Sequence, residues 1–169
     1  MAEAGPWKRA AEALKKRKKT EEAETRFTTE VERVLRLSGW SPGRRTDIAV
    51  WKEQLSGFSW HPAAERFLTE FGGVSVDVSG PGVDVAREPF TIDPELAVGE
   101  EEAFEELSER FGRRFFPLGE IGQGEFFLAL DEDGVLYLLA AWAFRLGPVE
   151  QGLENLVTGV KAVKLSLPE

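Results

Sequence analysis

Residues 60–82 read WHPAAERFLTEFGGVSVDVSGPG and carry the clearest structural signals of the chain. Pro62 suits the first position of a helix, because the N–H that proline lacks would have no hydrogen-bond partner within the helix at that position. The apolar residues that follow are spaced i, i+3, i+4 and i+7, which puts them on one helical face. They are Ala64, Phe67, Leu68 and Phe71. Gly72 follows directly and predicts the end of the helix through a positive φ.

The periodicity then changes from that of a helix to that of a strand. Three valines alternate with polar residues over positions 74–79, which is typical of a strand with one buried and one solvated face. A Gly-Pro-Gly turn at 80–82 ends the strand. The stretch therefore predicts a helix packed beside a strand.

The flanking segments extend this mixed pattern. Helices are predicted from Thr20 or Thr28 to Gly39, over 47–56, from Glu100 to Gly112 and from Gly147 to Val160. Strands are predicted over 83–92, 126–130 and 135–142, the last two joined by the turn Asp131-Glu132-Asp133-Gly134, with a connector over 113–124. The order predicts an α+β fold, with an antiparallel or mixed sheet and helices packed mainly on one side.

The length of 169 residues predicts one domain with additional tails. We expect a basic N-terminal tail, helical or disordered, over 1–26, a single α+β domain over 27–160 and a C-terminal tail over 161–169. The domain can form a packed core, since 42% of the chain is hydrophobic and it includes 12 Phe and 5 Trp.

Several classes of protein are excluded by composition. The chain has no cysteine, which rules out disulfides, thiolate catalysis and cysteine-ligated metal sites. The N-terminus lacks the apolar core of a secretory signal, and no stretch approaches the ~18 uncharged apolar residues of a membrane helix. We therefore expect a cytoplasmic protein that does not contact membranes.

Charge is distributed unevenly. Residues 1–27 hold eight Lys or Arg and five Glu, a net charge of +3, and the whole chain carries −9, so residues 28–169 carry −12. Such a body repels nucleic acid and attracts basic proteins, although solubility alone explains an acidic surface equally well. The basic tail could touch phosphates non-specifically, but a solvated tail is the favoured interpretation.

Catalytic and metal chemistry find little support. His61 is the only histidine and stands at a helix N-cap without a recognisable nucleophile or metal ligands beside it, so we interpret it as structural. The 131–134 turn lacks the remaining ligands of a calcium loop, and the glycines at 119–124 lack the lysine of a phosphate loop. We predict no cofactor, no metal and no catalytic residue. A hydrolase that uses carboxylates alone is the least favoured alternative.

Several short motifs, taken in order, resemble one known family. They are Gly39-Trp40-Ser41-Pro42-Gly43-Arg44, Asp47 and Trp51, His61-Pro62-Ala63-Ala64 with Phe67-Leu68, Glu70-Phe71-Gly72-Gly73, Gly80-Pro81-Gly82, Phe90 with Asp93-Pro94, Pro117-Leu118-Gly119-Glu120, and Leu128-Ala129-Leu130-Asp131 with Gly134 and Tyr137. With these motifs at these spacings, the chain resembles the third class of the SUKH superfamily, named partly for the yeast Smi/Knr proteins. The similarity spans residues 27–160 and leaves out the basic tail.

The resemblance implies an α+β fold and a role as an immunity protein of bacterial polymorphic toxin systems. Such proteins bind a cognate toxin, often a nuclease or another enzyme that attacks nucleic acid or proteins, and block it without being enzymes. A toxin of that kind is often basic, so an acidic inhibitor would be steered onto it and would imitate phosphate. The alternative is a regulatory or scaffold module with no toxin, as in other branches of the superfamily.

For a toxin interface we select acids expected on wet strand faces and in turns, together with one aromatic residue that precedes a helix. The predicted partner-binding residues are Trp60, Asp77, Asp84, Glu88, Glu120, Glu125, Asp131 and Asp133. No specific nucleic acid is expected as a partner.

Overall fold

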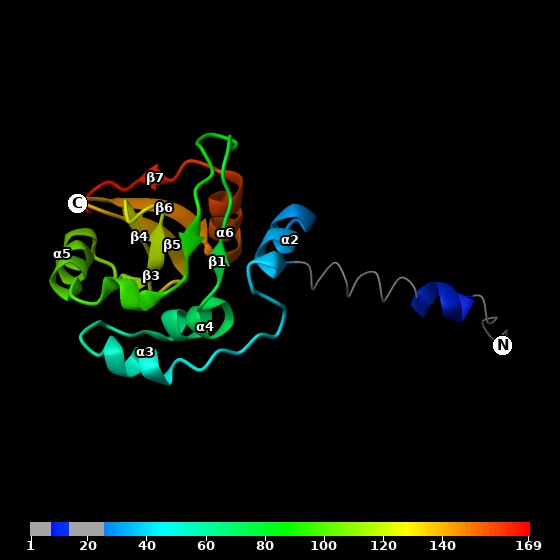
Figure 1. The fold of residues 1–169 in the computed structure, drawn as a ribbon, viewed down its shortest axis with the longest axis horizontal. Coiled ribbons are helices and arrows are strands. Elements are labelled where there is room, and N and C mark those ends of the chain that lie inside the picture. Colours follow the sequence, from blue (N-terminus) through cyan, green and yellow to red (C-terminus); the bar gives the residue numbers. More distant parts are fainter. Residues whose placement is uncertain (1–7, 14–25) are drawn as a thin grey trace.

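In the computed structural model, seven antiparallel strands form one sheet whose spatial order follows the chain order. Figure 1 shows the sheet together with the helices that connect its strands. The structure describes residues 8–13 and 26–169. The strands are β1 Ser75–Val76, β2 Phe90–Thr91, β3 Phe116–Ile121, β4 Phe126–Leu130, β5 Val135–Leu139, β6 Ala143–Pro148 and β7 Val163–Lys164. Each strand pairs with the next one, so the sheet is a meander with β1 and β7 at its edges.

Helices connect and cover these strands. They are α2 Thr29–Leu37, α3 Ala49–Gln54, α4 Pro62–Phe71, the 3₁₀ helix η1 Pro94–Ala97, α5 Glu101–Phe111 and α6 Val149–Thr158, and residues 8–13 are also helical. The α+β class predicted from the order of elements is confirmed. No helix within the described residues is long and apolar enough to cross a membrane.

Local signals place the helix ends. Of the two predicted starts of α2, the structure has the later one, where the Thr28 hydroxyl accepts a hydrogen bond from the N–H of Val31. The earlier start at Thr20 lies outside the described residues, as does most of the predicted tail over 1–26. At the end of α4, Gly72 has a φ of −56°, and Gly73 takes the positive φ of 86° that was expected one residue earlier.

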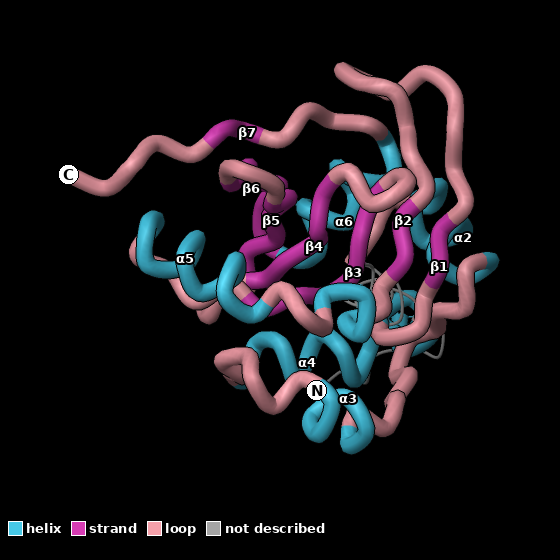
Figure 2. Tube along the Cα trace, turned by 60° about the vertical axis from the view of Figure 1, so that its left-hand side comes forward, coloured by secondary structure: helices cyan, strands magenta, loops and turns pink. Residues whose placement is uncertain are grey.

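The sheet is covered on both faces, because β4 and β5 are buried on both. Neighbouring residues of a strand point to opposite faces. Phe126 of β4 lines a hollow together with Leu156 of α6, whereas Phe127 packs against Phe104 of α5 at a ring distance of 5.5 Å. The two faces are called the α6 face and the α5 face below. Figure 2 shows these two helices on opposite sides of the strands.

The strands differ from the prediction more than the helices do. The alternation of buried Val74, Val76 and Val78 with exposed residues is present, but only Ser75–Val76 pairs as a strand. The strand predicted over 83–92 is reduced to β2, because residues 80–89 leave the sheet as a long loop. The predicted connector over 113–124 contains β3, and residues 143–148 form β6.

Arg26 anchors the N-terminal end of the domain through ion pairs. Its guanidinium pairs with Glu70 of α4 at 2.6 Å and with Glu150 of α6 at 2.7 Å, and it lies 5.5 Å from the ring centre of Phe27. Burial would lower the pKa of Arg26, but the hydrogen bonds to these two carboxylates raise it above its ordinary value. One side chain thus links the entry of the chain to two helices.

Candidate partner-binding surface

Helix α5 presents a row of carboxylates to solvent. Its apolar side chains Phe104, Leu107 and Phe111 are buried against the sheet, so its remaining faces are polar. Glu101, Glu105 and Glu109 follow at intervals of four residues and therefore lie along one side of the helix. We call these three residues the α5 row.

Most of this charge has no opposite charge beside it. On the neighbouring side of α5, Glu106 pairs with Arg110 at 2.7 Å. Glu101 accepts a hydrogen bond of 3.3 Å from the N–H of Gly99. Among the described residues, no ion pair involves a member of the α5 row. These carboxylates are therefore available for cations from outside the protein.

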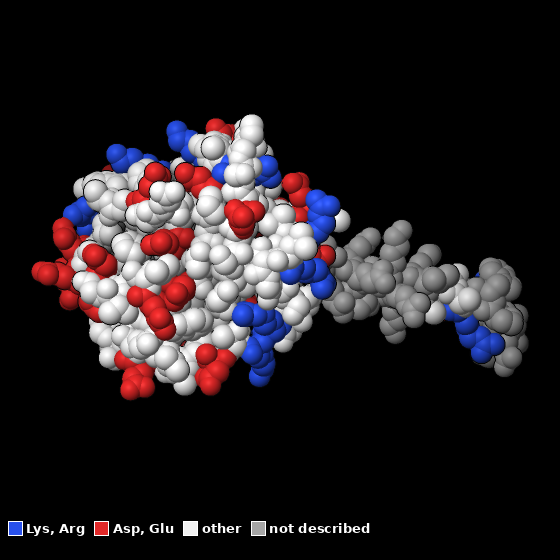
Figure 3. All heavy atoms as spheres, in the orientation of Figure 1, with Lys and Arg blue, Asp and Glu red and all other residues white. Residues whose placement is uncertain are grey.

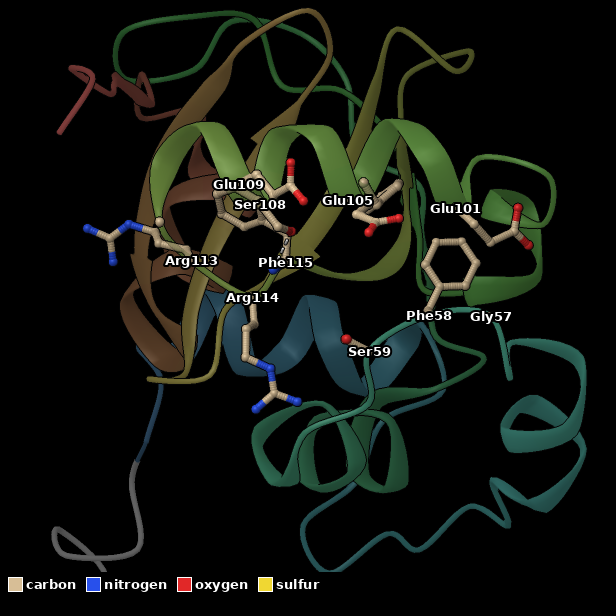
Figure 4. A pocket seen from close by; sticks show the side chains of 12 residues that line it. Gly57, Phe58, Ser59, Glu101, Glu105, Ser108, Glu109, Arg113, Arg114 and Phe115 are labelled. Carbon is tan, nitrogen blue, oxygen red and sulfur yellow. Dashed lines mark hydrogen bonds between the residues drawn. The ribbon is translucent and has the colours of Figure 1, made fainter.

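The α5 row forms one wall of a hollow of about 410 Å³. Figure 4 shows its three carboxylates along the helix, with Phe58 facing the Glu101 end. Phe58 also packs against Phe104 in an edge-to-face contact at 5.5 Å. Arg113 and Arg114 lie at the opposite end of the hollow. A partner's basic side chain that enters it would meet carboxylates on the wall and aromatic rings at one end.

The α5 face of the sheet adds one acid from β3 and one that directly follows β1. Glu120 is in register with Phe127, so both lie on the face that α5 partly covers. Thr91 of β2 pairs with Glu120 and Ser75 of β1 pairs with Thr91, so these two residues lie on the same face toward the sheet edge, with their hydroxyls 3.2 Å apart. Asp77 follows Ser75 by two residues and is exposed on that side. The structure thus brings Asp77 and Glu120, both predicted, onto the same face as the α5 row.

Three other predicted acids lie near the same end of the sheet. The Glu88 carboxylate lies beside Gly122 in the β3–β4 turn, and the exposed Glu125 immediately precedes β4. Glu88 points toward the α6 face, where it lines a hollow. Asp84, in the loop over 80–89, accepts a 3.0 Å hydrogen bond from the N–H of Lys161.

Asp133 lies at the far end of β4. This strand of five residues separates it from Glu125 by about 17 Å along the sheet. Asp133 is exposed in the β4–β5 turn and lines a hollow with Arg26, Arg66 and Glu150, where both signs of charge are present. It is therefore not part of one continuous surface with the other predicted acids.

Asp131 does not lie on the surface, which corrects the prediction. It is 0% exposed. One carboxylate oxygen accepts from the N–H groups of Asp133 and Val135, at 2.9 and 3.1 Å. The other accepts from the Tyr137 hydroxyl at 2.8 Å and from Arg113 at 3.2 Å. Burial, with the hydrogen bond to Asp131, raises the pKa of Tyr137 above its ordinary value. Asp131 is a structural residue of the hairpin turn.

Trp60 is half buried and packs onto Phe116 with ring centres 4.1 Å apart. Its indole N–H donates to the carbonyl oxygen of Leu55 at 3.0 Å. Both the ring and its polar atom are thus engaged within the protein, which makes Trp60 a weaker candidate for an interface anchor than the sequence indicates.

His61 is 2% exposed and satisfies both ring nitrogens internally. Nδ1 accepts from the N–H of Ala64 at 3.1 Å, and Nε2 lies 3.0 Å from the carbonyl oxygen of Arg114 and 3.2 Å from that of Leu130. These contacts fit the neutral ring with its proton on Nε2. Desolvation by burial lowers the pKa of His61. The residue joins the start of α4 to two distant segments.

The whole body shows the same excess of negative charge. Figure 3 shows acidic side chains across the visible face and gathered over the α5 end. Sequence reasoning missed the α5 row, although its spacing was visible: five Glu occupy 101–109, and Arg110 is the only base in the helix. Within the part of the chain that the structure describes, no group of three His, Cys, Asp or Glu could hold a metal ion.

Comparison with models of protein families gives a match over most of the chain. The model of the SUKH-3 immunity protein family matches residues 27–159. No curated protein and no solved structure matches significantly. The matched residues run from the buried Phe27 to the glycine that ends α6, and so include every helix and strand from α2 to α6. The chain belongs to the SUKH-3 immunity protein family.

Proposed function

We propose that this protein is a bacterial immunity protein that binds a cognate toxin and neutralises it by forming a stoichiometric complex in the cytoplasm. The observation that carries the proposal is membership in the SUKH-3 immunity protein family over nearly the whole described body. Inhibition by binding requires a stable surface of ~800 Å² on each partner and no catalytic residue of its own.

The charge of the body supports a basic toxin as the partner. Residues 28–169 carry −12, and the α5 row adds a local group of carboxylates without ion pairs among the described residues. Such a field accelerates encounter with a basic protein, and fixed carboxylates occupy sites that normally bind phosphate. We therefore propose a toxin whose active surface is basic, as in enzymes that act on nucleic acid.

The interface that we propose centres on the α5 row, Asp77 and Glu120. The hollow beside the α5 row provides a recess for a lysine or arginine of the toxin. Glu88, Glu125 and Asp84 extend the acidic region around the β3–β4 end of the sheet, and Trp60 and Asp133 lie outside it. Asp131 is excluded from the interface, because it is buried and fully hydrogen-bonded.

The first test is co-expression with the product of the adjacent gene, followed by co-purification and calorimetry. Rescue of growth together with a 1:1 complex is the expected result. No toxicity and no complex would favour the regulatory module instead.

A charge-reversal pair then locates the interface. Glu105→Lys with Glu109→Lys should weaken toxin binding by about tenfold or more, mainly through slower association at low salt. The matched control is Glu30→Lys with Glu53→Lys, which makes the same change of charge at exposed positions in α2 and α3. Equal affinities for the two variants would show that the α5 row is not the toxin-binding surface.

A further inference from the structure

The C-terminal residues 160–169, called the strap here, close the edge of the sheet beside β6. Val163 and Lys164 form β7 and pair with Arg145 and Phe144. The N–H of Leu165 donates to the carbonyl oxygen of Ala143 at 3.0 Å, and the indole of Trp142 donates to the carbonyl oxygen of Leu165 at 2.7 Å. Figure 1 shows this last segment running along the outside of the sheet to the C-terminus.

The strap is weakly embedded. Among its residues none is buried, and Val163 is 67% exposed. Its strand pairing covers two residues only. A segment with so little buried apolar area and such short strand pairing opens more easily than the central strands. When it opens, it uncovers the N–H and C=O groups of β6, which form an edge that accepts another strand.

An apolar hollow of about 320 Å³ lies directly beside this edge on the α6 face. Phe126, Leu138 and Phe144 contribute to it and are all half buried. Ala162 precedes the paired Val163, so the alternation of a strand places it on the same face as Phe144, and it lines the hollow together with Val160 and Lys161 of the strap. A methyl group leaves most of the hollow unfilled, whereas a leucine or phenylalanine at this position of a strand would occupy it.

The charge around the hollow also selects its occupant. Glu88 lines it, and Asp84 binds the strap backbone at Lys161. The strap itself combines apolar residues with Lys161 and Lys164, and Lys164 lies over the Trp142 ring at 5.1 Å. An incoming strand with the same apolar and basic character would suit this acidic rim.

We infer that the β6 edge is a second binding site, which accepts an extended segment of a partner protein in place of the strap. The segment pairs with β6 as an antiparallel strand and places a large apolar side chain in the hollow at the position of Ala162. Basic residues flank that side chain. The site lies on the face opposite the α5 row and shares with the proposed toxin interface only its outlying acids Glu88 and Asp84, so the charge reversal in the α5 row and the locking of the strap test the two sites separately.

Two synthetic peptides provide the probe. One has the sequence of residues 160–169, and the other carries the equivalent of Ala162→Leu. The receiving protein is the full chain with Arg145→Cys and Val163→Cys. The native chain has no cysteine, and Cα atoms of paired antiparallel residues lie within reach of a disulfide. Oxidation locks the strap in place, and reduction frees it.

The control variant carries Ser75→Cys with Thr91→Cys, which are paired at the opposite edge of the sheet. Fluorescence anisotropy of labelled peptide should show binding to the reduced strap variant and to the control in either state. Locking the strap should weaken binding by about tenfold or more. The leucine peptide should bind more tightly than the native peptide. Equal binding to the locked and reduced proteins would overturn the inference, as would no binding to either.

Hydrogen exchange on the unmodified chain gives a second test that needs no variant. Amides of 163–165 should exchange at least about 100-fold faster than those of β4 and β5. Equal protection would show a fixed edge cover and would overturn the inference. If the protein forms a dimer that disappears when the strap is locked by oxidation but not in the control variant, the occupant of the β6 edge is a second copy of this chain. That result would overturn the proposal that a segment of another protein binds there.

Discussion

At the scale of single residues, His61 shows how the hydrogen bonds of a buried polar side chain can stabilise a fold. Its two ring nitrogens join the start of α4 to the chain before β3 and to the end of β4. A protonated ring would need a second acceptor at Nδ1, which faces the N–H of Ala64 instead. Folding therefore favours the neutral form, in agreement with the lowered pKa.

This preference predicts a loss of stability in mild acid. In the unfolded chain His61 has an ordinary pKa of about 6.5 and takes up a proton below that pH, while the folded protein resists it. The free energy of unfolding should be constant from pH 8 to 7 and should fall as the pH drops below about 6.5. Urea titrations at pH 7.5, 6.5 and 5.5 measure this.

The control variant is His61→Asn, which keeps an N-cap acceptor but does not titrate. Its stability should be lower than that of the native chain at pH 7.5 and should change less between pH 7.5 and 5.5. Parallel pH profiles for the two proteins would mean that His61 does not cause the effect.

Asp131 and Tyr137 form the second residue-scale case. Tyr137→Phe removes a hydrogen bond to a fully buried carboxylate, which then keeps Arg113 and two backbone donors. We expect a loss of about 1–3 kcal/mol in the free energy of unfolding by denaturant titration. Ser75→Ala removes an exposed hydroxyl and should cost less than ~0.5 kcal/mol. Similar losses for the two variants would contradict a special role for the buried pair.

At the scale of elements, helices could be predicted more accurately than strands. Helix ends carry local signals, such as Thr28 before α2 and Gly112 with its φ of 64° after α5. The predicted connector over 113–124, which contains β3, carries Pro117 and glycines at 119, 122 and 124, which indicate a connector when taken alone. Part of it becomes a strand because its neighbours on both sides supply partners, and a register shift between Pro117 and Gly119 absorbs the irregularity.

Gly119 is the residue that permits this strand. A Cβ atom there would lie 1.8 Å from the carbonyl oxygen of Thr91 in β2. Gly119→Ala should therefore force β2 and β3 apart, with a loss of more than ~3 kcal/mol in the free energy of unfolding. Gly112→Ala is the matched control, because its positive φ is strained but no atom lies within 4 Å. It should cost only about 1 kcal/mol. Equal costs would contradict the close approach of the two strands.

At the scale of the whole molecule, composition predicts an acidic body but not the arrangement of its acids. Asp77 and Glu120 lie on one face because β1, β2 and β3 pair in a particular register. Asp131 lies inside because Arg113 and Tyr137 converge on its turn. Both facts depend on long-range pairing, which local patterns do not encode. The α5 row was the exception, since a helix places its residues by spacing alone.

The described body has one continuous core, and this predicts how it unfolds. Buried residues from Phe27 to Val157 form a single cluster, which includes both faces of the sheet. Trp40 packs against Phe27 and Phe71 at one side of it, while Trp142 packs against Phe111 of α5. Because no separate core exists within the described residues, neither half can keep its packing once the other opens.

Thermal or urea unfolding should therefore give one transition, with coincident midpoints for tryptophan fluorescence and far-ultraviolet circular dichroism. A fluorescence change well before the loss of helix would instead indicate two units, and Trp40→Phe and Trp142→Phe would show which side opens first.

A single transition bears on binding as well. The α5 row is held in place by Phe104, Leu107 and Phe111, so its carboxylates keep their positions for as long as the core is intact. A surface fixed in advance loses little entropy on association, which a tight inhibitor requires.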